Sequence, residues 1–170
     1  MKKLLVIGSY NADMVVTTQR FPKPGETIIG ESFMMNPGGK GANQAVAAAR
    51  FDAPVTFITC LGTDLFGNNA LRDFKTENID ARYIFTDAHQ PSGTALITVD
   101  SQGENNIVVI PGANNSLTID RIKTIEHIIP EFDYLLMQLE IPLETVAYIA
   151  FMAKNKGKRV ILNPAPARGH

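Results

Sequence analysis

The sequence predicts an α/β fold: a mainly parallel, Rossmann-like sheet with flanking helices, and a small β-structure that projects from it. Three observations support this prediction. Short apolar runs alternate with amphipathic segments of about 10–15 residues, which is the pattern of βαβ units. Two β-rich stretches, at about 12–35 and 94–110, interrupt that alternation. No internal repeat, low-complexity tract or linker divides the 170 residues, so one domain is expected over 1–170.

The chain begins with a predicted buried strand, because LLVIGS at 4–9 is a short continuous apolar run. Two β-branched strands follow, DMVVTTQ at 13–19 and ETIIGESFMM at 26–35. Apolar residues at helical spacing predict a helix from Ala42. The run VTFITCLG at 55–62 predicts a second buried strand.

The rest of the chain continues the alternation of strands and helices. In order, the predicted elements are a helix at 65–79, a hairpin at 93–114 with the turn DSQGEN, a helix at 117–129, a strand at 134–140, a helix at 143–157 and a strand at 159–167. Asp64 and Thr118 stand where they would cap helices, and Gly157 stands where it would end one.

Composition excludes several classes of partner. With 16 Lys and Arg against 17 Asp and Glu, the net charge is −1, and no basic field is available to attract nucleic acid or an anionic membrane. The only cysteine, Cys60, lies in an apolar run and is expected to be a buried, unreactive thiol. No apolar stretch is long enough for a membrane span, and Leu4–Ile7 is too short for a signal peptide. These features together predict a cytoplasmic protein.

The stretch NPGGKGANQAVAAAR at 36–50 suggests a phosphate-binding loop but matches neither common type. A Walker A loop needs Ser or Thr after Gly-Lys and a glycine five residues before the Gly-Lys pair. Gly41 and Met34 occupy those positions. A dinucleotide fingerprint needs three spaced glycines after the first strand, where only Gly8 occurs.

Physical reasoning on the same loop leaves two interpretations open. Gly38, Gly39 and Gly41 would let the backbone approach a ligand closely, and a helix start is expected to offer unpaired N–H donors. Lys40 adds a cation, and Asn43 can both donate to and accept from a hydroxyl. A polyol therefore suits the site at least as well as a phosphate. A tight strand–helix turn would explain the glycines alone.

Three further polar residues follow predicted strands. Asn11 and Asp13 come after the first strand, and Glu140 ends the run YLLMQLE. Ligands of open α/β sheets bind outside the carboxyl ends of strands, and a carboxylate can accept from two hydroxyls at once. The alternatives are an Asx turn at Asn11 and Asp13, and a cap by Glu140 on the helix that follows it.

The remaining polar candidates are weak. His89, His127 and His170 share no metal-ligand spacing with each other or with Cys60, and Ser9 has no neighbouring base in the sequence.

Taken together, the motifs have a family likeness. NPGGKGANQAVAAAR followed by CLGTDLFG resembles the N-terminal signature of the ribokinase-like (PfkB) family of sugar and nucleoside kinases. VIGSYNADMVV, FPKPGETIIG, QLEIP and ILNPAPA extend the resemblance over essentially the whole chain. That length corresponds to a little over half of a family member, so a fragment of a longer protein is expected.

The resemblance implies a sugar site and a lid. Asn11 and Asp13 match residues that hydrogen-bond ribose hydroxyls. The other matching positions of the sugar site are Gly39, Lys40, Asn43 and Glu140, with Gly38 shaping the turn. The β-stretches at 12–35 and 94–110 match a β-lid that covers the sugar and forms a homodimer interface.

The implied activity is transfer of the γ-phosphoryl group of ATP to the 5-hydroxyl of D-ribose. ATP, Mg²⁺ and a monovalent cation such as K⁺ are implied cofactors whose main sites lie beyond residue 170. No catalytic residue is assigned within the chain, because the family's base aspartate belongs to a later Gly-Ala-Gly-Asp segment. The chain alone is therefore expected to be inactive as a kinase. Asp52 replaces a usual Gly or Ser, a benign change because Asp tolerates the left-handed conformation.

Other functions stay open at this stage. Deoxyribose, fructose and nucleoside kinases are the alternatives within the family, and a non-catalytic sugar-binding or dimerisation module is an alternative outside catalysis. A nucleotide-dependent oxidoreductase is disfavoured by the missing fingerprint.

Overall fold

The computed structural model describes residues 2–167, and its centre is a four-stranded sheet in the order β10, β9, β1, β4. All neighbouring strands in this sheet are parallel. The strands are β1 Leu4–Ile7, β4 Val55–Ile58, β9 Tyr134–Met137 and β10 Arg159–Leu162. The predicted α/β architecture with a mainly parallel sheet is confirmed.

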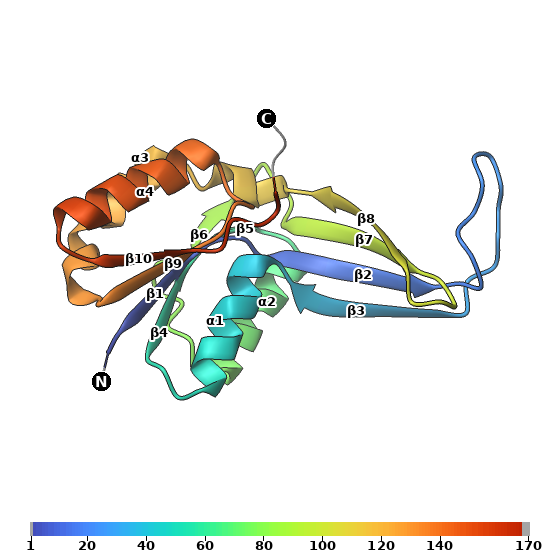
Figure 1. The fold of residues 1–170 in the computed structure, drawn as a ribbon, viewed down its shortest axis with the longest axis horizontal. Helices are drawn as coiled ribbons and strands as arrows, with labels where there is room; N and C mark the ends of the chain where they lie inside the picture. The colour runs from blue at the N-terminus through green and yellow to red at the C-terminus, as the bar shows by residue number, and fades with distance from the viewer. Residues whose placement is uncertain (1, 168–170) are drawn as a thin grey trace.

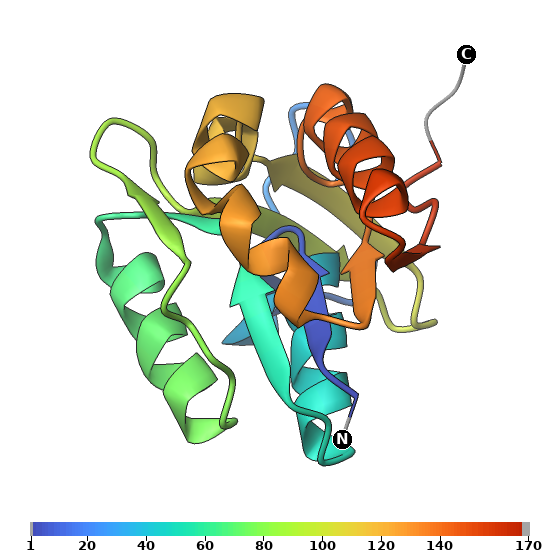
Figure 2. The same cartoon turned by 90° about the vertical axis from the view of Figure 1, so that its left-hand side faces the viewer.

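Helices cover both faces of this sheet (Figures 1 and 2). They are α1 Lys40–Arg50 and α2 Leu65–Thr76 on one face, and α3 Ile119–Ile125, the 3₁₀ segment η2 Glu126–Glu131 and α4 Leu143–Asn155 on the other. Successive side chains of a strand point to opposite faces. Leu5 and Ile7 therefore belong to the core with α3 and α4, and Val6 to the core with α1 and α2. Burial on both faces explains the uninterrupted apolar run of β1.

A second four-stranded sheet, in the order β3, β2, β7, β8, projects from this body (Figure 1). We call it the projecting sheet. Its strands are β2 Asn11–Thr17, β3 Ser32–Gly38, β7 Gly93–Val99 and β8 Asn105–Ile110. The β2–β7 pair is parallel and the outer pairs are antiparallel. The expected hairpin is present as β7 and β8.

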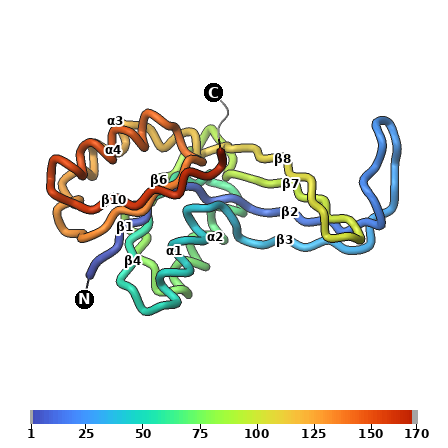
Figure 3. Tube along the Cα trace, in the orientation of Figure 1, coloured from blue at the N-terminus to red at the C-terminus, as the bar shows by residue number. Residues whose placement is uncertain are grey.

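The strand predicted at 26–35 is displaced in the structure. Residues 18–31 form a loop at the far end of the projecting sheet (Figure 3), and β3 runs from Ser32 to Gly38. Pro22, Pro24 and the left-handed Gly25 (φ 77°) favour a turn here. Without a partner strand, the β-branched residues that follow do not pair, and Ile29 is 89% exposed.

Other boundaries also differ from the prediction, among them that of the strand at 159–167, which ends at Leu162. The strand at 55–62 divides into β4 and β5 Cys60–Gly62, and β5 pairs with the unpredicted β6 Phe85–Asp87. The helix at 117–129 is shorter than predicted, because it passes into η2, a 3₁₀ segment that contains Pro130. The strand at 134–140 ends at Met137, so Glu140 lies outside the sheet.

The predicted helix ends are confirmed. Asp64 accepts a hydrogen bond from Gly67 N at 2.9 Å, and Thr118 accepts from Arg121 N at 3.4 Å. Gly157 ends α4 in the left-handed region (φ 66°). Asp52 is also left-handed (φ 58°), as expected of a residue that tolerates this conformation.

The chain crosses between the body and the projecting sheet near the carboxyl end of β1 in the central sheet. The crossings are at residues 8–10 between β1 and β2, at Gly39 between β3 and α1, at Ser92 before β7, and at Pro111 between β8 and the 3₁₀ segment η1 Gly112–Ser116. Ligands of open α/β sheets bind at this end of the sheet, outside the carboxyl ends of the strands. Across residues 2–167, every helix is too short or too polar to span a membrane.

Candidate sugar-binding site

A small cavity of about 130 Å³ lies where the projecting sheet meets the body. Its polar lining residues are Asn11, Asp13, Gly39, Lys40, Asn43 and Glu140, and its apolar ones are Ala95, Ile97, Ile107 and Val109. The structure thus brings together six of the seven residues singled out in the sequence. They come from β2, from the β3–α1 junction and from the segment after β9.

The seventh residue, Gly38, does not line the cavity but leaves room for a residue that does. A Cβ on Gly38 would lie 2.1 Å from Asp13 Oδ2, so a side chain here would displace the carboxylate. Gly39 is needed for a different reason, since its φ is 88°.

The start of α1 is not an open anion site. Lys40 N donates to Glu140 Oε2 at 2.9 Å, Gly41 N donates to Ser9 Oγ at 3.3 Å, and Ala42 N donates to the Ser9 carbonyl at 2.9 Å. The expectation of unpaired donors at this helix start is therefore wrong. The Glu140 carboxylate occupies the place that a phosphate would take at a helix N-terminus.

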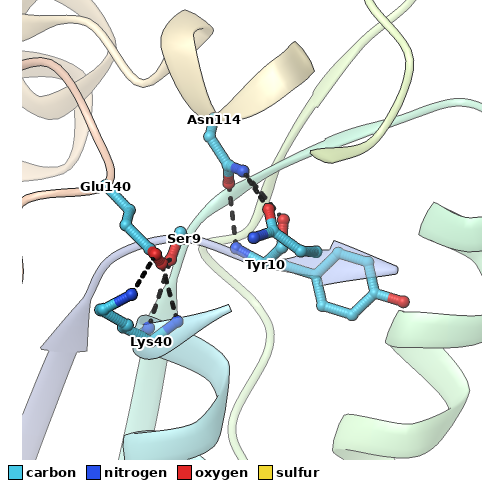
Figure 4. A network of polar contacts seen from close by, with 7 residues as sticks. Ser9, Tyr10, Lys40, Asn114 and Glu140 are labelled. Atoms are coloured by element: carbon cyan, nitrogen blue, oxygen red, sulfur yellow. Dashed lines mark hydrogen bonds and ion pairs between the residues drawn. The ribbon is translucent and has the colours of Figure 1, made fainter. Parts of the chain in front are cut away.

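Glu140 joins three segments of the chain (Figure 4). Besides the Lys40 backbone, its carboxylate accepts from Lys40 Nζ at 2.6 Å and from Ser9 Oγ at 2.6 Å. Burial opposes ionisation of Glu140, but these hydrogen bonds outweigh it and hold its pKa below the ordinary value. Glu140 therefore caps α1, which begins 100 residues earlier in the sequence, and not α4, the helix that follows it.

The pKa of Asp13 is shifted in the opposite direction from that of Glu140. Burial, and then the negative charge of Glu140, raise the pKa of Asp13, while Lys40 opposes the rise. Within residues 2–167 its carboxylate accepts no hydrogen bond. A half-buried carboxylate facing a cavity without an internal partner is an acceptor available to ligand hydroxyls.

Sequence patterns assign no role at this site to two residues of the region: Ser9, which is discounted because it has no neighbouring base, and Asn114, which is not singled out. Ser9 orients Glu140, and Asn114 donates to Asn11 across 103 positions of sequence. Ser9 could have been suspected from its place after a buried strand. Nothing in the local sequence around Asn114 indicates its partner.

Other expectations concern residues away from the cavity. Cys60 is 1% exposed, which confirms that its thiol is buried. Burial is the main cause that raises the pKa of this thiol to about 11, a direction that disfavours the reactive thiolate. Among the residues that the structure describes, no three His, Cys, Asp or Glu side chains are grouped to hold a metal ion. His170 lies outside the described residues.

Comparison with known proteins finds a family match over nearly the whole chain. The family described as pfkB family carbohydrate kinase matches residues 1–169. The ribokinase of Haemophilus influenzae is 47% identical over 167 residues, which cover 98% of this chain and 55% of that protein. The deoxyribokinase of Salmonella typhimurium is 38% identical over 164 residues, 96% of this chain and 54% of that protein.

A solved structure of a related protein has a similar fold. The ribokinase of Arabidopsis thaliana complexed with ribose and ATP superposes with a TM-score of 0.84 at 32% identity, over 97% of this chain and 54% of that one. The chain spans about half the length of the curated relatives that it matches.

Proposed function

The chain belongs to the pfkB family of carbohydrate kinases, and we propose that the protein containing it transfers the γ-phosphoryl group of ATP to the 5-hydroxyl of D-ribose. The single observation that carries the sugar assignment is Asp13, whose carboxylate faces a polar cavity without a hydrogen-bond partner among the described residues. The name of the Haemophilus influenzae relative supports ribose as the acceptor.

In this proposal the chain supplies the acceptor half of the reaction. Asp13 accepts hydrogen bonds from sugar hydroxyls, and Asn43, exposed on the first turn of α1, donates to or accepts from another. Lys40 and Glu140 hold each other at the edge of the cavity, and Gly39 lets the backbone approach the sugar. Fixed partners of this kind lower the barrier by orienting the attacking hydroxyl.

The projecting sheet is the proposed lid. Its residues Ala95, Ile97, Ile107 and Val109 provide an apolar wall to the same cavity. An apolar cover excludes water, which would otherwise compete with the sugar as phosphoryl acceptor.

The described residues do not fit the implied cofactors. The glycine-rich helix start is already filled by Glu140 and Ser9, and no carboxylate cluster suited to Mg²⁺ is present within residues 2–167. We therefore assign no residue of this chain to ATP, Mg²⁺ or a monovalent cation. A cytoplasmic location is proposed with the ATP-dependent activity.

The test is ADP release by the protein containing this chain, with ATP and a panel of acceptors. The highest kcat/KM is expected for D-ribose. Asp13→Ala should lower it by roughly 10- to 100-fold, as expected for loss of a charged hydrogen-bond acceptor, with KM for ATP unchanged. Equal turnover of the Asp13→Ala variant and the wild type would overturn the assignment.

A second candidate acceptor is 2-deoxy-D-ribose, which the 38% identity to a deoxyribokinase favours. The two sugars differ by one hydroxyl, so the ratio of their kcat/KM values in the same panel decides between them.

A further inference from the structure

Asn114, in η1, has its side-chain amide held on both sides. It is 1% exposed, and its Oδ1 accepts from Tyr10 N at 2.9 Å. Its Nδ2 donates to the Tyr10 carbonyl at 2.9 Å and to Asn11 Oδ1 at 2.9 Å (Figure 4). Every polar atom of this amide therefore has a protein partner.

These contacts determine which way the neighbouring amide of Asn11 points. A backbone N–H can only donate, so the Asn114 atom facing Tyr10 N must be the oxygen. The Asn114 NH₂ group then faces Asn11, and because NH₂ can only donate, the Asn11 atom that meets it must also be the oxygen. The Asn11 NH₂ group is left for the cavity that Asn11 lines.

Gly93 shows that the surroundings are shaped to allow this contact. Its backbone is opposite Asn11 in the register of β2 and β7. A Cβ on Gly93 would lie 2.2 Å from Asn114 Nδ2 and 2.4 Å from Asn11 Oδ1. Any larger residue at this position would separate the two amides.

We propose that Asn114 is a positioning residue that sets Asn11 as a hydrogen-bond donor in the sugar cavity. This inference rests on the proposed function. Asn11 and Asp13 are two residues apart on β2 and therefore share one face of the strand. The cavity then presents a fixed donor beside a fixed acceptor, which matches neighbouring sugar hydroxyls because each hydroxyl can both accept and donate. The hydrogen bonds run in one direction, from Asn114 to Asn11 to the sugar, and from the sugar to Asp13.

The test compares Asn114→Asp with Asn115→Asp. The first places an acceptor against Asn11, so the Asn11 amide turns over and offers its oxygen to the cavity. The second adds the same charge on a neighbouring exposed residue. In the protein containing this chain, Asn114→Asp is expected to raise the Kd for D-ribose at least tenfold, while Asn115→Asp changes it less than twofold. Equal effects of the two variants would overturn the proposal.

A double-mutant cycle separates positioning from general damage to the fold. If Asn114 acts through Asn11, then Asn114→Asp has less than a twofold further effect on the D-ribose Kd in the Asn11→Ala background. Additive losses would contradict the proposal.

The NMR signal of the Asn11 side-chain NH₂ group tests the orientation without any sugar. It should shift in Asn114→Asp and stay in place in Asn115→Asp. If that shift occurs but no sugar binds the wild type, the orientation is upheld and the proposed function fails. If D-ribose binds the wild type and the signal does not move, the function stands and the positioning role is wrong.

Discussion

Asp13 and Glu140 are two carboxylates that line the same cavity, and their surroundings shift their pKa values in opposite directions. Burial and the charge of Glu140 raise the pKa of Asp13. Hydrogen bonds from Lys40 and Ser9 outweigh burial and lower the pKa of Glu140. Carboxylates separated in this way have separate tasks. Glu140 is the carboxylate that holds α1, and Asp13 is the acceptor that we propose for the ligand.

Sugar binding is expected to weaken on acidification because of Asp13. Its raised pKa means that it takes up a proton at a higher pH than the ordinary 3.8. A protonated carboxyl group has lost its negative charge and turned one oxygen into a donor, so it accepts hydrogen bonds from hydroxyls more weakly. The Kd for D-ribose, measured by calorimetry at decreasing pH from about pH 8, should start to rise at a higher pH than a carboxyl group with the ordinary pKa of 3.8 would require. It should then rise by up to about tenfold per pH unit below the pKa of Asp13. Asp13→Asn should remove this dependence, and a pH-independent wild-type Kd would contradict the assignment.

Glu140→Gln tests the structural role of the second carboxylate. The variant should lower the free energy of unfolding by about 2 kcal/mol at pH 7, because charged hydrogen bonds to Lys40 and Ser9 are lost. The folded pKa lies below the ordinary value of 4.5, so this stabilisation is present above about pH 4.5 and disappears as the pH falls through the folded pKa. Urea unfolding at several pH values would show the gap to wild type closing in acid. The exposed Glu144→Gln should show no comparable gap.

Among the secondary-structure elements, α2 is attached to the projecting sheet through its N-cap. The Asp64 carboxylate accepts from Gly67 N at 2.9 Å inside the helix and from Ser92 N and Ser92 Oγ at 2.7 Å each. Ser92 directly precedes β7, and its Oγ also accepts from Gly62 N at 3.0 Å. One side chain thus fixes the helix start and the entry of the chain into the sheet.

Asp64→Ala is expected to lower the free energy of unfolding by more than an ordinary cap loss, about 2–3 kcal/mol, because buried Ser92 loses its acceptor as well. Urea denaturation measures this. Asp73→Ala, an exposed change in the same helix, is the matched control and should stay within about 0.5 kcal/mol. Equal losses from the two variants would show that the contact to Ser92 contributes nothing.

Comparison of prediction and structure shows which elements can be found from sequence. The buried strands and amphipathic helices were predictable because hydrophobic periodicity records burial directly. Residues 26–31 were misassigned because their β-branched side chains resemble a strand, whereas strand formation needs a partner that this loop lacks.

At the candidate site, too, some residues could be found from the local sequence and one could not. Asn11, Asp13 and Glu140 could be predicted from their places after strands. Asn114 could not be predicted, because its role depends on a contact with Asn11 across 103 positions.

At the scale of the whole molecule, the projecting sheet is apolar on both faces. Strand register places the cavity-lining Ile107 with Asp13 on one face, whereas Val108 pairs with Leu96 on the other. The exposed apolar residues of the face away from the cavity are Phe33, Met35, Leu96, Val108 and Ile110. A group of exposed apolar side chains of this kind marks an interaction surface. We propose that it pairs with a second copy of the chain.

Two adjacent substitutions test this assignment, since Ile107 and Val108 are 52% and 62% exposed on opposite faces. Val108→Glu is expected to convert a dimer of the protein containing this chain into a monomer in sedimentation velocity. Ile107→Glu should instead raise the Kd for D-ribose and leave the dimer intact. A wild-type monomer at all concentrations, or a dimer that survives Val108→Glu, would contradict the proposed interface.

The crossings between the body and the projecting sheet have a mechanical consequence. They include residues 8–10, Gly39 and Pro111, and they surround the cavity at the edge where β1 ends. The projecting sheet is thus attached to the body around this cavity. The packing at this junction is close, because a Cβ on Gly39 would clash with the backbone of residues 9–11, and a Cβ on Gly93 would clash with the Asn11 and Asn114 side chains and the Tyr10 carbonyl. A change in the angle between the projecting sheet and the body would change the shape of this cavity, so we expect a label on the distant loop at 18–31 to respond when a ligand binds.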